Sequence, residues 1–378
     1  MSDANPTAAT LDGPGGPTED LQARMERFLR LQSSSCAGIG SPIYEELCVH
    51  IADDVRRGGV SWDLLASRAH LSFGAALPLR FLGAVHRLAL SGGAPRLAAH
   101  YPSCGGTSGA GLLDAFDATV RENSQAILPQ LDADVQTNEV GRSAVLFEAL
   151  GHIAELTGHP LALREIGASA GLNLAMPWFR YSDGDHVGGD PSGVVEIADR
   201  WRGDMRPRFR SFAIASRSGC DRAPVDATTE AGLLRLLGFI WPDQLERLER
   251  TRRAVATLRA HPVSVHAANA ADWLDSQLTD TAVGDPPVTT VVYHSIVWQY
   301  VAHDDRARIT AALERRGALA TRERPLAWVR FEPEDRLLLH ARTTLRLWDG
   351  VANTGAPQAL ARSGFHGEWV ELCEPEPA

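Results

Sequence analysis

The sequence contains no lysine, so arginine supplies all 37 basic residues of the 378-residue chain. A P-loop places a lysine on the phosphates of its nucleotide, and a pyridoxal-phosphate enzyme forms an imine with a lysine. The absence of lysine therefore excludes both chemistries from this chain.

Positive charge is also scarce relative to negative charge, because the formal net charge is −10 and the arginines form no basic stripe. Surfaces that bind nucleic acid are basic, since they must neutralise phosphates. We therefore expect no nucleic-acid partner, and the composition favours a small-molecule substrate.

Cysteines are few, odd in number and far apart along the chain: Cys36, Cys48, Cys104, Cys220 and Cys373. Zinc sites and redox pairs usually place cysteines within a few residues of each other. The pattern predicts reduced thiols in a cytoplasmic protein and no metal site.

Apolar runs of membrane-spanning length are absent, and residues 1–20 are polar and rich in proline, glycine and alanine. This N-terminal segment lacks the apolar centre of a signal peptide. We expect a disordered tail over 1–20, no membrane partner and a cytoplasmic location; the oligomeric state is left open.

The hydrophobic pattern divides the rest of the chain into two predicted domains. Over residues 21–158 apolar residues recur every three or four positions, which predicts an all-helical domain that serves as a lid or substrate wall. Over 159–378 short apolar strands alternate with helices, which is typical of a parallel α/β sheet. A glycine- and aspartate-rich turn within 179–201 predicts an inserted hairpin. Strands are predicted at 161–166, 211–217, 263–267, 289–293, 326–331, 344–348 and 368–372.

The segment Leu163–Asn173, LREIGASAGLN, is an apolar strand that runs into a turn of small residues and then a helix. Small side chains let the backbone and a helix N-terminus approach a ligand closely. A glycine turn of this kind is weak evidence when taken alone.

The motif Glu165-x-Gly167-x-Ser169-x-Gly171 resembles the first motif of class I S-adenosylmethionine-dependent methyltransferases, acid-x-Gly-x-Gly-x-Gly, with serine in place of the middle glycine. The resemblance continues in the same order along the chain to about residue 372. It implies S-adenosylmethionine as cofactor and a Rossmann-like, mostly parallel sheet of seven strands that ends in an antiparallel hairpin formed by the last two predicted strands.

By this resemblance, several residues are expected to contact the cofactor. Asp221, in the segment GCDRAP, corresponds to the acid on the ribose hydroxyls, and a carboxylate suits a vicinal diol because it accepts two hydrogen bonds. Asp272 and Trp273 follow the third strand, where the family holds the adenine, and His294 and Ser295 follow the fourth, beside the methyl group. The full expected cofactor set is Glu165, Gly167, Ser169, Gly171, Asn173, Asp221, Asp272, Trp273, His294 and Ser295.

The sequence offers little in the way of catalytic groups, as expected for methyl transfer, which depends on alignment and exclusion of water. If the acceptor must lose a proton, His294 is the first candidate for the base and Glu139, in the segment NEVGR, is the second. The segments GCDRAPVD, WPDQ, HSIVWQY and NEVGR together also resemble a bacterial family of unknown function.

Two other interpretations remain open. Gly167-x-Ser169-x-Gly171 also fits the nucleophile elbow of an α/β-hydrolase esterase or amidase, with Asp221 or Asp272 as the orienting acid and His294 or His366 as the base. That fold needs several strands before the elbow, where this sequence predicts helices. The third interpretation is a non-catalytic binding protein that retains a nucleotide-binding fold.

Overall fold

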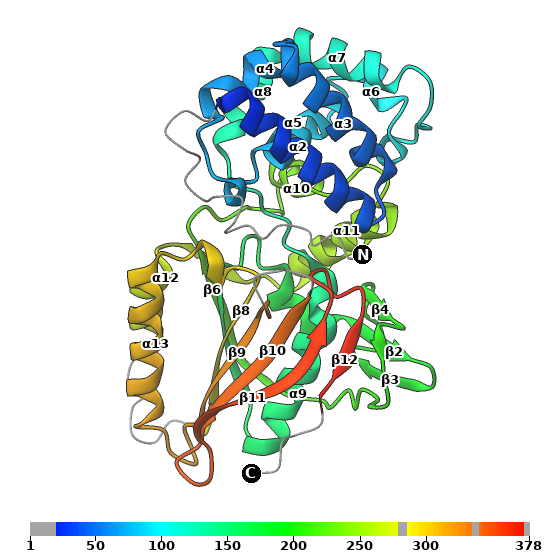
Figure 1. Ribbon diagram of the computed structural model, residues 1–378. Coiled ribbons are helices and arrows are strands. Elements are labelled where there is room, and N and C mark those ends of the chain that lie inside the picture. The colour runs from blue at the N-terminus through cyan, green and yellow to red at the C-terminus, as the bar shows by residue number, and fades with distance from the viewer. Residues whose placement is uncertain (1–19, 279–285, 335–339, 374–378) are drawn as a thin grey trace. The chain divides into compact units, whose positions relative to one another are not determined.

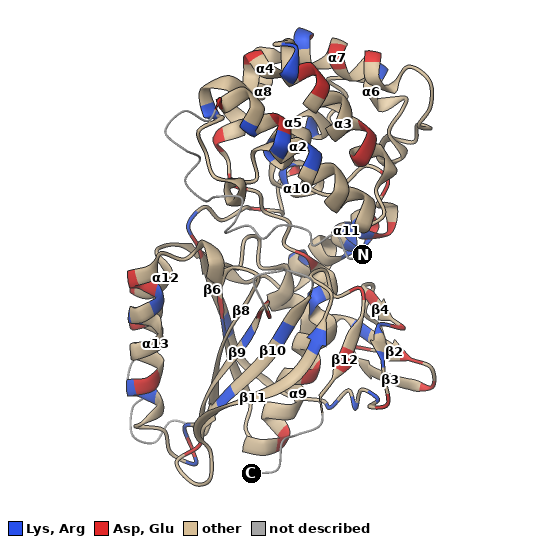
Figure 2. Ribbon diagram, in the orientation of Figure 1, with Lys and Arg blue, Asp and Glu red and all other residues tan. Residues whose placement is uncertain are grey.

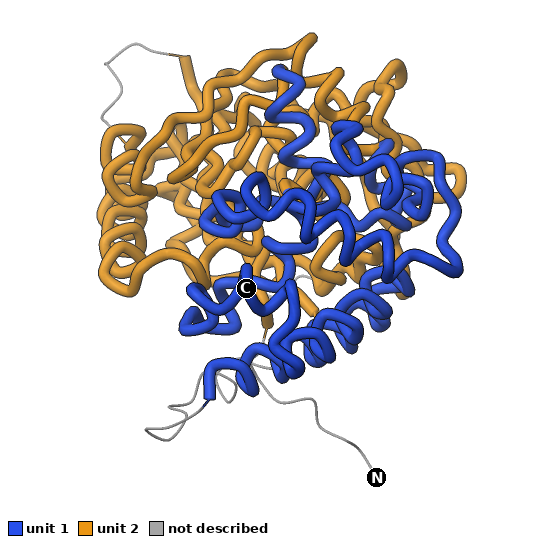
Figure 3. Tube along the Cα trace, turned by 90° about the horizontal axis from the view of Figure 1, so that it is seen from above, with its two compact units in different colours: residues 1–137, 229–249 blue, residues 138–228, 250–378 orange. Residues whose placement is uncertain are grey.

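The computed structural model describes residues 20–278, 286–334 and 340–373. The predicted tail therefore lies outside the described residues except for Asp20. The chain forms two compact units: unit 1 comprises residues 1–137 and 229–249, and unit 2 comprises 138–228 and 250–378 (Figure 3). The sequence placed its boundary at 158, whereas the helix that ends at Thr157 belongs to unit 2 and residues 229–249 belong to unit 1.

Unit 1 is built from helices around a large apolar core and a smaller apolar cluster (Figure 1). Its helices are α2 (Leu21–Gly38), α3 (Pro42–Arg56), α4 (Val60–Leu65), α5 (Leu77–Leu90), α6 (Pro95–Ala98), α7 (Leu112–Glu122), α8 (Ser124–Ile127), α10 (Glu230–Gly238) and the start of α11 (Leu245–Ala260). Local signals set several helix starts: the Asp20 side chain accepts the Gln22 N–H at the start of α2, and Ser41 precedes Pro42 and caps α3. Gly83 of α5 packs against Phe239, which follows α10, so closely that a Cβ there would lie 2.7 Å from the Phe239 ring. This contact joins the inserted segment to the N-terminal helices.

Unit 2 contains a sheet of nine strands in the order β5-β12-β11-β10-β9-β8-β1-β6-β7. The strands are β1 (Leu161–Ile166), β5 (Trp201–Arg202), β6 (Ile214–Asp221), β7 (Ser264–Ala267), β8 (Thr289–Ser295), β9 (Leu326–Pro333), β10 (Ala341–Trp348), β11 (Thr354–Ser363) and β12 (Val370–Leu372). The five strands from β7 to β9 are parallel, as predicted for an α/β fold. β8 is buried on both faces and rich in β-branched residues, as expected for a central parallel strand.

The predicted end of the sheet is wrong. The expected hairpin between 344–348 and 368–372 does not form: β10 pairs with both β9 and β11, and β12 pairs with β11, so the sheet is larger than the seven strands expected. The sequence pattern missed β11 because Gly355 and Pro357 interrupt it. Pro357 is tolerated because the pairing of β10 with β11 shifts register nearby.

Helices α9 (Ser143–Thr157), α12 (Ala270–Gln277) and α13 (His303–Gly317) cover the sheet. α9 is buried along most of its length, because its sequence SAVLFEALGHI is apolar nearly all round. Val292 and Trp328 pack with Ile309 and Leu313 of α13 on one face of the sheet, and neighbouring strand residues such as Tyr293 point to the other. Figure 2 shows acidic and basic residues side by side on α12 and α13.

The crossover from β1 to β6 departs from a simple strand–helix–strand unit. It begins with a 3₁₀ segment, η6 (Leu172–Trp178), and continues through β2 (Arg180–Asp183), β3 (His186–Gly189) and β4 (Glu196–Ala198), which form a separate sheet in the order β3-β2-β4. β2 and β3 form an antiparallel hairpin within the range expected for an insertion.

Candidate functional site

The glycine loop, residues 167–172, follows β1 at the point where the order of the parallel strands reverses. β6 and β7 lie on one side of β1, and β8 and β9 lie on the other. Open α/β sheets bind their ligands at this switch point, beyond the carboxyl ends of the strands. The loop is therefore the centre of the candidate site.

Backbone geometry explains the spacing of the motif. Gly167, Ser169 and Gly171 all have positive φ, at +70°, +52° and +80°. Glycine adopts this region without penalty, whereas serine is strained there. The loop thus needs a permissive residue at every second position, and Ser169 occupies the middle one at an energetic cost.

The backbone N–H groups of the glycine loop are already engaged within unit 2. Those of Gly167 and Ala168 donate to the Cys220 carbonyl, that of Gly171 to the Ala168 carbonyl, and those of Ala170 and Leu172 to Asn138 Oδ1. The Ser169 N–H donates to Asp221 Oδ2 at 2.9 Å. The loop therefore presents no ready cradle of N–H groups for a phosphate, unlike a P-loop.

Asp221 ends β6 and fixes the loop after β1. Besides the Ser169 N–H, its carboxylate accepts the Ala223 N–H through Oδ1 at 2.9 Å. Asp221, the acid expected to bind a ribose, therefore also stabilises the glycine loop and the turn that follows β6. A carboxylate has acceptor capacity beyond these two bonds.

The segment Asn138–Arg142 packs against the glycine loop and belongs to the same compact unit. Asn138 has a φ of +39°, and Glu139 accepts the Gly141 N–H and lies 3.5 Å from Arg250. Arg142 donates to the carbonyls of Ser295 and Phe365. Glu139, the second candidate base, is therefore committed to contacts that hold this segment.

Glu165 and Tyr293 face each other from neighbouring strands, with the Tyr293 hydroxyl 3.4 Å from Glu165 Oε2. Burial raises the pKa of Glu165 well above its ordinary value, and the Tyr293 hydrogen bond and the charge of Arg142 oppose that shift only in part. The group at the start of the motif is accordingly favoured as a neutral carboxylic acid.

Because the pKa of Glu165 is raised on folding, the native state binds more protons here than the unfolded chain. Stability contributed by this group is present below the unfolded pKa, near 4.5, and is lost as the pH rises through the folded pKa. We expect Glu165→Gln to remove this loss, so that the variant gains stability relative to wild type between about pH 5 and pH 8. Thermal unfolding across this range checks it, with Glu323→Gln at an exposed position as control; parallel pH curves for Glu165→Gln and wild type would contradict it.

On the α13 face of the sheet, His294 of β8 contacts a carboxylate that the sequence did not single out. Its Nδ1 lies 2.5 Å from Glu332 Oε1 of β9, and its side chain is fully buried. The ring stacks on Trp298 with centroids 4.8 Å apart. Ser295, next in the chain, is bound on the opposite side by Arg142.

Among the described residues, four buried polar atoms around these strand ends have no hydrogen-bond partner: Ser169 Oγ, Asn173 Oδ1, His294 Nε2 and Glu332 Oε2. An unpaired buried polar atom costs about 1–3 kcal/mol, and a bound ligand or water that pairs with it would offset this cost. Asn173 uses its other atom, Nδ2, to donate to the Glu139 carbonyl. The ends of β1, β8 and β9, where these atoms lie, form with the glycine loop the candidate functional edge.

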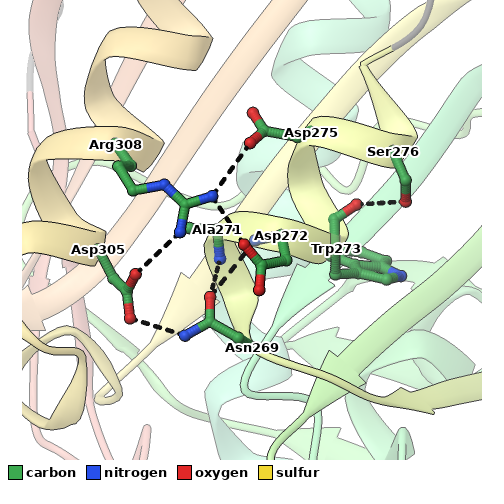
Figure 4. A network of polar contacts seen from close by, with 8 residues as sticks. All are labelled: Asn269, Ala271, Asp272, Trp273, Asp275, Ser276, Asp305 and Arg308. Carbon is green, nitrogen blue, oxygen red and sulfur yellow. Dashed lines mark hydrogen bonds and ion pairs between the residues drawn. The ribbon is translucent and has the colours of Figure 1, made fainter.

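Two of the predicted cofactor-binding residues, Asp272 and Trp273, contact other parts of unit 2. Asp272 is 67% exposed on α12 and forms an ion pair with Arg308 of α13 at 2.7 Å (Figure 4). Asn269 caps α12 by accepting the N–H groups of the next residues, and its amide donates to Asp305. Trp273 is packed in the core beneath α12. The structure therefore brings Glu165, the glycine loop and Asp221 together, but gives Asp272 and Trp273 partners of their own.

Over the described ranges 20–278, 286–334 and 340–373, no group of three or more histidine, cysteine, aspartate or glutamate side chains could hold a metal ion. The helices found in the same ranges include none that is long and apolar enough to cross a membrane.

A family model described as "Uncharacterized protein conserved in bacteria (DUF2332)" matches residues 26–372. No curated protein and no solved structure matches the chain.

Proposed function

From the premise that the chain belongs to this bacterial family, whose description names no activity, we propose that unit 2 binds S-adenosylmethionine and transfers its methyl group to a small molecule. The observation that carries the proposal is the glycine loop at the switch point of the strand order β7-β6-β1-β8-β9, with Asp221 at the end of the adjacent strand. This order equals that of the first five strands in a dinucleotide-binding Rossmann sheet.

The bonding of the glycine loop selects among adenosine ligands. A dinucleotide or nucleoside triphosphate needs free backbone N–H groups for its phosphates, and those of residues 167–172 donate to Cys220, Ala168, Asn138 and Asp221. S-adenosylmethionine has no phosphate, so it suits a loop that offers close backbone approach without N–H donors.

In this proposal the Asp221 carboxylate accepts the ribose hydroxyls in addition to the Ser169 and Ala223 N–H groups, and Ser169 Oγ and Asn173 Oδ1 supply polar contacts near the loop. His294 and Ser295 lie beside the reacting centre. Asp272 can serve the adenine amino group only by sharing its carboxylate with Arg308. When bound, the cofactor supplies the methyl group as an electrophile; the protein aligns the acceptor and excludes water.

Calorimetric titration of the purified chain with S-adenosylmethionine, and separately with S-adenosylhomocysteine, tests the proposal. We expect saturable binding to one site with a dissociation constant between roughly 1 µM and 1 mM, and no binding of NAD in a parallel titration. Absence of binding by a folded protein would overturn the proposal.

That negative result would favour the hydrolase alternative. Ser169 has a strained φ of +52°, as the serine of a nucleophile elbow does. A serine-reactive fluorophosphonate, with Ser169→Ala as the matched control, would then identify the nucleophile.

A further inference from the structure

His294 and Glu332 form a buried polar contact at the candidate functional edge. Both residues are buried at the ends of neighbouring parallel strands. Glu332 Oε1 accepts from the N–H groups of Val297 and Trp298, at 3.1 and 3.2 Å, in addition to its contact with His294 Nδ1. Because an ionised carboxylate oxygen can only accept hydrogen bonds, the hydrogen in its contact with His294 lies on Nδ1.

The same carboxylate holds a strained turn. Ile296, between His294 and the two residues that donate to Glu332, has a φ of +52°, which is a genuine outlier for a β-branched side chain. Such strain persists only where surrounding contacts over-determine the backbone, and it is common at functional sites. Glu332 therefore fixes both the histidine ring and the turn that follows it.

This turn reaches the glycine loop. A Cβ at Gly167 would lie 2.4 Å from Val297 Cγ2, so Val297 packs directly on the loop proposed to hold the cofactor. The His294 ring is itself stacked on Trp298, in the same turn. His294 is thus coupled to the proposed cofactor loop through residues 297 and 298.

The outer nitrogen of His294, Nε2, is buried. It has no hydrogen bond to any part of the chain that the structure describes. With the hydrogen on Nδ1, a neutral ring presents a lone pair at Nε2, so this atom can accept a proton.

We infer that Glu332 is a positioning residue that holds His294 as the Nδ1–H tautomer, and that His294 Nε2 takes the proton from a methyl acceptor bearing an O–H or N–H group. The inference rests on the proposed function. As the acceptor lone pair bonds to the methyl carbon, the carbon–sulfur bond breaks and its electron pair stays on sulfur. The acceptor's proton passes to Nε2, and the Glu332 carboxylate balances the resulting imidazolium charge.

Nitrogen-15 NMR of the full chain labelled at histidine tests the tautomer without any ligand. His294→Gln assigns the resonance, and His303→Gln, at a 94% exposed side chain, is the matched control. We expect His294 at neutral pH to show a protonated Nδ1 and an unprotonated Nε2. A proton on Nε2, in either the other tautomer or the imidazolium, would overturn the inference.

Substitutions of Glu332 test its positioning role. Glu332→Gln keeps an oxygen that accepts from Nδ1, Val297 and Trp298, so we expect a folded variant with the tautomer retained. Glu332→Ala removes the acceptor, and we expect loss of the single tautomer, with Glu323→Gln unchanged as control. A single Nδ1–H tautomer in Glu332→Ala would contradict the role, and so would a folded Glu332→Gln with the hydrogen on Nε2.

Titration of the labelled chain with S-adenosylhomocysteine separates this inference from the proposed function. We expect the His294 Nε2 resonance to move on binding and that of His303 to stay. Binding by calorimetry without movement at His294 would remove His294 as the base, whereas absence of binding would remove the cofactor and leave the tautomer result standing.

Discussion

Replacing Gly167 with alanine is expected to lower the free energy of unfolding of unit 2 by about 3 kcal/mol and to abolish binding of S-adenosylmethionine. Gly167 has a φ of +70°, which costs an alanine about 1–2 kcal/mol. The new Cβ would also lie 2.4 Å from Val297 Cγ2, and overpacking of this kind adds about 1–3 kcal/mol. Relief of that contact must move the turn after β8 away from the glycine loop.

Gly158 provides the matched control for this substitution. Its φ is +71°, yet among the described residues no atom beyond Gly158 and its chain neighbours lies within 4 Å of its ideal Cβ position. Gly158→Ala should therefore lose only the backbone contribution, about 1–2 kcal/mol, and keep cofactor affinity. Chemical denaturation and calorimetry of both variants separate the backbone contribution from the Val297 clash.

A second substitution, Val297→Ala, tests the same contact from the side of Val297. Val297→Ala removes Cγ2 and Cγ1, which would lie 2.4 and 3.2 Å from the Gly167→Ala methyl group, and keeps Cβ at 3.0 Å. The double variant should therefore recover part of the stability lost by Gly167→Ala alone. If Gly167→Ala and Gly158→Ala lose the same free energy of unfolding, the Val297 side chain does not clash with a methyl group at position 167.

The parallel half of the sheet was predictable because its strands are short apolar runs between helices. β1, β7, β8 and β9 lie within a few residues of the expected ranges. β11 was not predictable, since its half-buried sequence TGAPQALARS has neither alternation nor an apolar run. Residues 229–249 belong to unit 1 although segments of unit 2 flank them in the sequence. Their helical pattern does not indicate to which unit they belong.

The glycine loop and Asp221 were predictable for a similar reason, because each follows a recognisable strand. The groups that organise them were not. Asn138 binds the loop from more than thirty residues away, as Glu332 does for His294. Asn138 lies in the NEVGR segment, which the sequence singled out for Glu139 rather than for Asn138, and Glu332 lies in no recognised motif. A weak signal existed for Glu332: Trp328, Arg330 and Glu332 alternate along β9, which places them on one face.

Asp221→Ala is expected to reduce affinity for S-adenosylmethionine by about 100-fold or more, since each hydrogen bond to a charged group contributes roughly 1.5–3 kcal/mol. The structure adds a second effect. Loss of the acceptors for the Ser169 and Ala223 N–H groups should also lower the free energy of unfolding by about 2 kcal/mol. A fall in affinity alone would thus not distinguish ribose binding from disruption of the loop.

Two further variants separate these causes. Asp226→Ala removes an aspartate that accepts the N–H two residues on, at Thr228, as Asp221 does with Ala223; its Oδ1 also accepts the Thr228 hydroxyl. It should lose only about 0.5–1 kcal/mol of stability and no affinity. Asp221→Asn keeps one acceptor oxygen, so it should be intermediate in stability, yet lose nearly as much affinity as Asp221→Ala because it cannot accept from both ribose hydroxyls. If affinity instead falls in proportion to stability across all three variants, Asp221 acts through the shape of the loop, and another group must recognise the ribose.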